Sequence, residues 1–221
     1  MLVLRPDRQV ERELLATIAP GTYVAGVDEV GRGALAGPAS VGIALVGMET
    51  SDDFPDNLRD SKLLSPAARQ ALVEPVRAWV SASAVGHADA EDVNEYGIIG
   101  ALRIAAKNAL LQLTDFPIGA VLLDGSHDWW SSDGLFDPGA SLPHFPVRME
   151  VKGDARCAVI AGASVLAKVE RDEIMIAAAE QFPGYGLERN KGYASKEHIA
   201  GLGARGASRF HRTAWKLPGI K

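Results

Sequence analysis

The chain has 221 residues, of which 47% are hydrophobic and 23% are charged, a composition typical of one globular domain. Its single cysteine, Cys157, excludes a disulfide within the chain and a zinc site built on cysteines. No apolar run is long enough to cross a bilayer, and the first residues are too charged for a signal peptide, so we expect a cytoplasmic protein without membrane contacts.

Charge is distributed unevenly along the chain, although the formal net charge is only −5. Residues 1–150 carry 11 basic and 21 acidic side chains, whereas residues 151–221 carry 12 basic and 7 acidic ones. We therefore expect a main domain over residues 1–185 and a basic helical segment over residues 186–221 that packs on it. Such a segment suits a polyanionic partner, although a solvated helical face would have the same composition.

The hydrophobic pattern predicts the following elements in chain order. A helix over residues 3–16 precedes a strand over 22–28 and its hairpin partner over 39–46. A helix follows to about residue 78, with Ser65 as its cap and Pro66 at its first position, and then a strand over 79–88 and a helix over 90–113. A buried strand over 119–125, an irregular excursion over 126–145, a strand over 146–151 and a long helix over 158–181 lead to short basic helices. This order predicts an α/β domain with a mixed sheet flanked by helices.

Three of the predicted strands are followed by acidic residues. Asp28 and Glu29 end the first strand, Asp124 ends the fourth, and Asp154 lies just past the fifth. Ligand sites of α/β sheets form at the carboxyl ends of strands, and convergent carboxylates bind hard cations. The sequence therefore predicts a divalent-metal site, in which two Mg²⁺ or Mn²⁺ ions would promote an in-line displacement at phosphate.

The glycine-rich turn after the first strand has two other interpretations. Gly31-Arg32-Gly33 resembles a dinucleotide-binding loop, but Ala36 occupies the position of its third glycine, and the two acids before it would face a pyrophosphate. A surface turn capped by a carboxylate is the simpler alternative. Glycines that admit a phosphate and an arginine fork that binds one favour a phosphodiester ligand instead.

Seven motifs occur in an order that resembles the ribonuclease HII (type 2 ribonuclease H) family, over about residues 22–215. They are Asp28-Glu29-Val-Gly-Arg-Gly33, Asp60-Ser-Lys62-Leu, Leu-Leu-Asp124-Gly, Lys152-Gly-Asp154, Ala163-Ser-Val-Leu-Ala-Lys168-Val-Glu-Arg-Asp172, Lys191-Gly-Tyr193 and His211-Arg212. The resemblance implies a ribonuclease H-like mixed five-stranded sheet with a small helical C-terminal part.

The resemblance also implies the roles of the site residues. Asp28, Glu29, Asp124 and Asp154 would be the catalytic, metal-binding carboxylates, with Asp28 bridging two ions, Asp154 on the nucleophile side, and Glu29 and Asp124 on the leaving-group side. Gly31, Arg32, Gly33 and Tyr193 would contact the ribose 2′-hydroxyl, the group that distinguishes RNA from DNA. Lys62 would contact a phosphate, and Ser164, Lys168 and Arg212 are weaker candidates for contacts with the nucleic-acid backbone.

Other reactive side chains are expected to be structural. Asp172 should pair within its helix, Trp129 and Trp130 should pack rather than stack on bases, and Cys157 should be a packed helix residue. The histidines at 127, 144, 198 and 211 lack the spacing of a zinc site.

Some positions depart from the family pattern without removing a carboxylate. Ala34 replaces a common proline, Asn190 a common histidine and Ser195 a threonine, and the 126–145 excursion is longer than the usual spacer.

The sequence thus predicts a monomeric, metal-dependent endoribonuclease that takes part in ribonucleotide excision during DNA replication and repair. It would cut the RNA strand of RNA/DNA hybrids and single ribonucleotides in duplex DNA, leaving 3′-hydroxyl and 5′-phosphate ends. A nuclease without this ribonucleotide preference and a non-enzymatic nucleic-acid-binding module are the alternatives. Tyr193 argues against the first alternative, and four acids beside a phosphate ligand argue against the second.

Overall fold

A computed structural model of the chain describes residues 5–59, 61–131 and 139–220, and its core is a five-stranded mixed sheet. The strands are β1 (Tyr23–Val30), β2 (Ala39–Val46), β3 (Ala82–Ala88), β4 (Ile118–Asp124) and β5 (Val147–Glu150), in the spatial order β3-β2-β1-β4-β5. β2 is antiparallel to β1 and β3, whereas β1, β4 and β5 run parallel. The carboxyl ends of these three adjacent strands therefore lie at one edge of the sheet.

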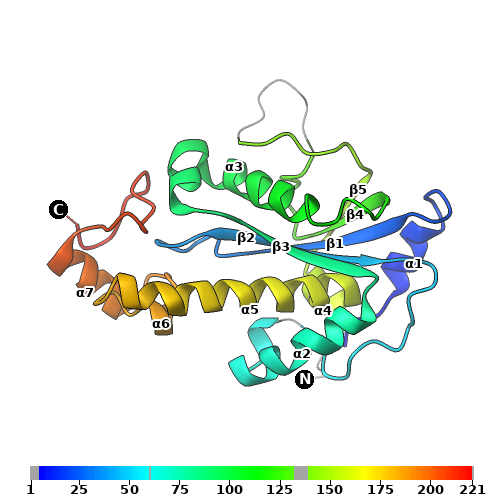
Figure 1. Ribbon diagram of the computed structural model, residues 1–221, viewed down its shortest axis with the longest axis horizontal. Coiled ribbons are helices and arrows are strands. Elements are labelled where there is room, and N and C mark those ends of the chain that lie inside the picture. Colours follow the sequence, from blue (N-terminus) through cyan, green and yellow to red (C-terminus); the bar gives the residue numbers. More distant parts are fainter. Residues whose placement is uncertain (1–4, 60, 132–138, 221) are drawn as a thin grey trace.

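Helices cover both faces of this sheet (Figure 1). They are α1 (Gln9–Leu15), α2 (Pro66–Trp79), α3 (Ala90–Leu110), α4 (Gly153–Arg156), α5 (Ala158–Gln181), α6 (Leu187–Asn190) and α7 (Lys196–Arg205), with a 3-10 turn, η1, at Ser61–Leu63. α3 packs on β2 and β3, α5 packs on β1 and β2 from the other side, and α2 lies against the outer side of α5. The sheet is thus the middle layer of three.

The close approach of α5 to the sheet depends on small residues. A Cβ atom at Gly26 of β1 would lie 2.5 Å from the Val159 side chain, so only glycine fits there. Alanine, valine and other apolar residues of α5 fill the core between the helix and β1 and β2. This packing fixes β1, which carries two of the acids, against the longest helix of the fold.

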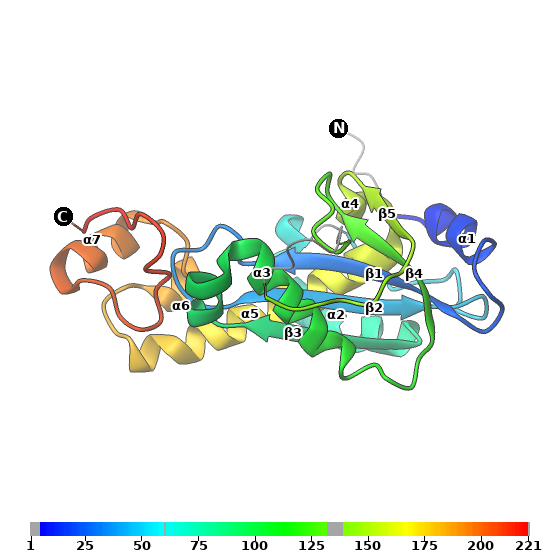
Figure 2. The ribbon, with the colours of Figure 1, turned by 90° about the horizontal axis from the view of Figure 1, so that it is seen from above.

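The C-terminal helices lie at one end of the molecule, beyond the sheet, and α1 lies at the other end (Figure 2). A separate apolar cluster joins these helices to α5 and to the loop after β1. It consists of Leu35, Ala36, Met175, Ala178, Tyr185, Leu187, Leu202 and Leu217. The division into residues 1–185 and 186–221 remains a prediction, but this cluster shows how the basic segment packs on the rest.

Most of the predicted elements occur with bounds shifted by a few residues, and the predicted fold class is confirmed. β1 continues to Val30 and therefore includes both Asp28 and Glu29. The helix predicted over 90–113 ends at Leu110 and is broken at Gly97, which has φ 69° and ψ 177°. η1 and α4 were not predicted, because three- and four-residue turns have too short a pattern to recognise.

Several predictions fall partly outside the described residues. The predicted helix over 3–16 includes positions 3 and 4, the motif Asp60-Ser-Lys62-Leu begins at residue 60, the excursion over 126–145 includes residues 132–138, and the basic segment over 186–221 includes residue 221. No helix in the described ranges is long and apolar enough to cross a membrane.

Candidate active site

The predicted acids come together at the carboxyl edge of the parallel strands. Val27 of β1 pairs with Leu123 of β4, so Asp28 and Asp124 are the next residues of two adjacent strands. Glu29 follows in β1, and Asp154 lies in α4, four residues after β5 ends. The topology thus brings to one edge of the sheet four acids whose sequence positions range from 28 to 154.

Asp28 is buried, with 5% of its surface exposed, and so is Asp154, with 4% exposed. Burial raises the pKa of Asp28 well above its usual range, and the neighbouring Asp124 and Glu29 carboxylates raise it further. A hydrogen bond with Ser164 and the charge of Lys62 lower the pKa of Asp28 but do not offset these effects. A buried acid beside two others is a place where a cation would relieve unfavourable charge.

The other three acids each receive a hydrogen bond from a nearby donor. Asp124 Oδ1 accepts a 2.7 Å bond from the Gly153 amide, and Asp154 Oδ2 lies 3.2 Å from Lys62 Nζ. Glu29 accepts two bonds, which are described separately below. These contacts orient the carboxylates and offset part of their charge.

The donor set fits a hard divalent cation, because all four side chains are carboxylates and such ions prefer oxygen ligands. Within the described ranges, no three His, Cys, Asp or Glu side chains stand together in a way that could hold a metal ion. Lys62 lies against Asp154, so a cation that bound there would compete with this ammonium group. The four acids as metal ligands therefore remain a proposal.

Two buried arginines hold the Gly-Arg-Gly loop that follows β1. Gly31 has φ +84°, and a Cβ atom at this position would lie 2.1 Å from Arg171 Nε. Arg171 donates to Pro38 O at 2.8 Å and to Lys191 O at 3.0 Å, and thus ties this loop to the Lys-Gly-Tyr segment. Arg212 donates to the Gly37 and Arg32 carbonyls.

Arg212 therefore needs a correction. The sequence suggested a direct contact with the nucleic-acid backbone, but the whole Arg212 side chain is buried and its donors bind loop carbonyls. Burial, together with the charge of the nearby Arg171, lowers the pKa of Arg212 to about 9. We assign Arg212 to holding the Gly31–Gly33 loop.

Tyr193 lies beside the same loop, with 39% of its surface exposed and the Arg171 guanidinium 5.6 Å from its ring centre. Its carbonyl is held by a chain of two buried histidines. Ser208 N donates to His211 Nδ1, so His211 Nε2 carries the proton and donates over 3.0 Å to His198 Nε2. His198 Nδ1 then donates to Tyr193 O at 3.0 Å. This chain requires neutral histidines, and burial accordingly lowers the pKa of His211 to about 4 and that of His198 as well.

The remaining substrate candidates have protein partners in the structure. Ser164 is buried and hydrogen-bonded to Ser61 Oγ at 2.9 Å, and Lys168 forms an ion pair with Asp172 in the same helix. The local pairing predicted for Asp172 is thus confirmed. Lys62 has an exposed side chain beside Asp154, which leaves it accessible to a phosphate. Direct contacts of Lys62, Ser164 and Lys168 with nucleic acid remain predictions.

The sequence missed the residues that support the site from a distance. No sequence pattern relates Arg171, His198 and His211 to the loops that they hold. Neither spacing nor composition therefore indicated these contacts. Trp129 and Trp130 are buried, as predicted, but the sequence gave no sign that Trp129 reaches an acid of the site.

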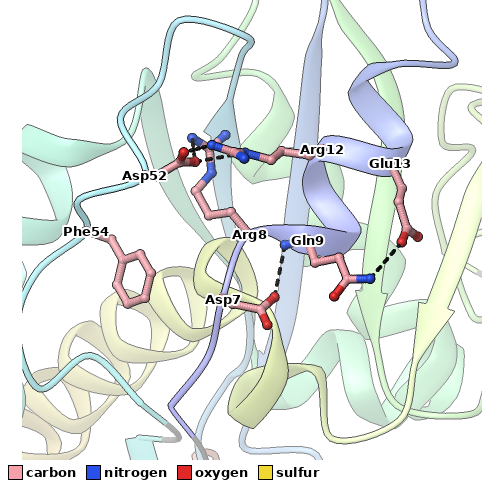
Figure 3. Close-up of a pocket in the computed structure, with 7 residues that line it drawn as sticks. All are labelled: Asp7, Arg8, Gln9, Arg12, Glu13, Asp52 and Phe54. Carbon is pink, nitrogen blue, oxygen red and sulfur yellow. Dashed lines mark hydrogen bonds and ion pairs between the residues drawn. The ribbon is translucent and has the colours of Figure 1, made fainter.

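A pocket of about 670 Å³ lies beside α1 and includes none of the four acids (Figure 3). Its charged side chains pair with one another: Asp52 lies against Arg8 and Arg12, and Glu13 accepts a bond from Gln9. Arg8 also donates to backbone carbonyls of residues 47–51. We therefore interpret the charged side chains of this pocket as a support for the loop after β2.

Comparison with known proteins points to one family. Residues 25–218 match the model of the family described as Ribonuclease HII. Ribonuclease HII of Streptomyces avermitilis is 42% identical over 210 residues, which is 95% of this chain and 83% of that protein. Ribonuclease H2 from Pyrococcus horikoshii OT3 has a similar fold, with a TM-score of 0.66 at 23% identity over 89% of this chain and 95% of that chain. Bst-RNase HIII in complex with Mn²⁺ has a TM-score of 0.60 at 20% identity over 90% of this chain and 67% of that chain.

Proposed function

Because the chain belongs to the ribonuclease HII family, we propose that it is a metal-dependent endoribonuclease that cuts RNA paired with DNA. Family membership makes the chain a ribonuclease H, and hence a hydrolase. We assign as its substrates the RNA strand of RNA/DNA hybrids and single ribonucleotides embedded in duplex DNA. The observation that carries this proposal is the buried Asp28 carboxylate, with Asp124 and Glu29 raising its pKa, next to the Gly31–Gly33 loop.

Asp28, Glu29, Asp124 and Asp154 would hold the metal ions. Two Mg²⁺ or Mn²⁺ ions bound there would supply Lewis-acid chemistry for attack of water on the phosphodiester. The complex of the related Bst-RNase HIII with Mn²⁺ supports this choice of cation, as does the all-oxygen donor set. We propose products with 3′-hydroxyl and 5′-phosphate ends.

The side chains around the acids would select and orient the substrate. The loop at Gly31–Gly33 and Tyr193 would contact the ribose 2′-hydroxyl, and their supports, Arg171 and the His198–His211 pair, fix them relative to each other. A preset arrangement lowers the entropy lost on binding. Lys62 would meet the phosphate from beside Asp154.

The proposal is tested by incubating the protein with a duplex that contains one ribonucleotide, with and without Mg²⁺ or Mn²⁺. Cleavage at the ribonucleotide in the presence of metal, with 3′-hydroxyl and 5′-phosphate ends, is expected. An all-DNA duplex of the same sequence is the matched control and should stay intact. Cleavage of that control would favour the DNA nuclease alternative, and binding without cleavage under every metal condition would favour the binding-module alternative.

A further inference from the structure

Each carboxylate oxygen of Glu29 receives one side-chain hydrogen bond. Arg32 Nη1 donates to Oε1 at 3.1 Å, and the indole nitrogen of Trp129, Nε1, donates to Oε2 at 3.1 Å. Arg32 comes from the adjacent loop and is half exposed, whereas Trp129 lies 100 residues away and only 2% of its surface is exposed. The indole is therefore the more rigid of the two donors.

The segment that carries Trp129 is built to hold its position. The buried Arg103 of α3 donates to the backbone carbonyls of Trp129 at 3.2 Å, Trp130 at 2.7 Å and Ala140 at 2.9 Å. Asp128 Oδ1 accepts bonds from the Trp130 and Ser131 amides, at 3.0 and 2.9 Å. The start of the long excursion after β4 is thus fixed to a helix on one face of the sheet.

Aromatic packing completes this support. The Trp129 and Trp130 rings lie 6.0 Å apart at a tilted angle, and the Trp130 ring lies 6.5 Å from that of Phe145. Trp130 Nε1 donates to Pro143 O at 3.2 Å. The indole N–H groups of Trp129 and Trp130 thus each donate one hydrogen bond from the same loop. Only the bond from Trp129 is accepted by an acid of the site.

We propose that Trp129 is a positioning residue that fixes the orientation of the Glu29 carboxylate for metal binding, an inference that rests on the proposed function. Carboxylates that ligate metals are commonly oriented by a further hydrogen bond. An indole suits this task because it is a donor only and is neutral, so it adds no positive charge that would compete with a cation. Glu29 Oε2 retains a second lone pair for a metal ion.

The test compares Trp129→Phe with Trp130→Phe, because each variant loses one indole N–H and the same ring area. Mg²⁺ binding to the free protein is measured by calorimetry, and cleavage of the single-ribonucleotide duplex is measured over a range of Mg²⁺ concentrations. Trp129→Phe should weaken Mg²⁺ binding and raise the half-saturating Mg²⁺ concentration by at least about 10-fold, with little change in KM for the duplex. Trp130→Phe should match wild type in both, even if it melts at a lower temperature. Equal Mg²⁺ affinities in the two variants would overturn the proposal.

A measurement on the wild-type protein covers the case in which Trp129→Phe does not fold. The chain has four tryptophans, so ¹⁵N labelling gives four indole signals. Mg²⁺ should shift the Trp129 signal and leave that of Trp79, which donates to Ser51 O, in place. A Trp129 signal that stays fixed at saturating Mg²⁺ contradicts the inference alone. A wild-type protein that neither binds Mg²⁺ nor cleaves the duplex contradicts the proposed function itself.

Discussion

Asp28 and its neighbours show how a few buried charges define the site. Asp28 has the Asp124 and Glu29 carboxylates beside it, and its own hydrogen-bond partners are Ser164 and the Glu29 amide. The surrounding fold keeps these acids together at a cost, because carboxylates near one another in a buried place disfavour ionisation. This arrangement supports the proposed cation site.

Asp124→Asn should abolish cleavage and leave the fold and hybrid binding largely intact. The Asn side chain retains an oxygen that can accept the bond from the Gly153 amide, and it removes one charge that acts on Asp28. The free energy of unfolding without metal should therefore not decrease. Cleavage of a single-ribonucleotide duplex, hybrid affinity and chemical denaturation measure the three effects. An Asp124→Asn protein that cleaves at the wild-type rate would refute the role of Asp124 as a ligand.

Tyr193 is the residue through which we expect the enzyme to sense an RNA-to-DNA junction. Tyr193→Phe removes one hydroxyl contact, worth about 0.5–1.5 kcal/mol. Tyr193→Ala also removes stacking of about 1–3 kcal/mol, by analogy with aromatic contacts to bases. Activity should decrease from wild type to Phe to Ala, most strongly on a single embedded ribonucleotide, while metal affinity by titration stays constant. Equal rates for Tyr193→Ala and wild type on that duplex would assign junction sensing to another residue.

The convergence of the four acids could be predicted from the sequence because each lies at or shortly after the end of a strand, and the carboxyl ends of parallel strands meet at one edge of a sheet. The donors that hold these acids could not be predicted. Trp129 and Glu29 are 100 residues apart, and Trp129 lies in an irregular excursion whose sequence has no periodicity. The same holds for Arg171, whose sequence context in α5 shows a buried helix position but not its carbonyl partners.

At the scale of elements, α1 and α5 are joined by a buried acid. Glu11 of α1 is fully buried, and its Oε1 accepts a 2.8 Å bond from the Val159 amide in the first turn of α5. Its Oε2 has no hydrogen-bond partner among the residues that the structure describes. Burial raises the pKa of Glu11 to about 7, so the protonated form predominates in the folded protein at mildly acidic pH.

Glu11→Gln should make stability less dependent on pH. Because the pKa of Glu11 is higher in the folded state than in the unfolded state, its contribution is fully present below about pH 4.5 and is lost as the pH rises through 7. Glutamine retains the bond from Val159 without a charge, so at pH 8 the variant should exceed wild type by up to about 3 kcal/mol in the free energy of unfolding. Urea denaturation at pH 5 and pH 8 measures this difference.

The matched control is Glu13→Gln on the same helix. Hydrogen bonds from Arg148 and Gln9 lower the pKa of Glu13, so its pH effect has the opposite sign. Its contribution is present at neutral pH and is lost as the pH falls. If Glu11→Gln and wild type lost stability equally between pH 5 and pH 8, the buried charge of Glu11 would not be the cause.

At the scale of the whole molecule, the acids and the basic segment occupy different places. The acids lie at the carboxyl edge of β1, β4 and β5, whereas α6, α7 and the C-terminal residues lie beyond the end of the sheet (Figure 2). The loop at Gly31–Gly33 and Tyr193 connect these two regions through Arg171 and Arg212. A duplex that reached the acids and this loop would continue toward the basic segment, where its phosphates would meet positive charge.

Neutralising Arg205, Arg209 and Lys216 should therefore weaken binding of every duplex sequence alike. All three are exposed, unlike Arg212, which we leave unchanged because it holds the Gly31–Gly33 loop. Each lost phosphate contact should reduce the slope of log affinity against log salt concentration by about 0.9. Binding of the triple variant Arg205→Gln/Arg209→Gln/Lys216→Gln to two unrelated duplexes, between low and moderate salt, measures this slope. Arg77→Gln, which removes an exposed arginine paired with Glu74 on α2, is the control and should keep the wild-type slope. If the triple variant also kept that slope, these residues would form a solvated face rather than a nucleic-acid surface.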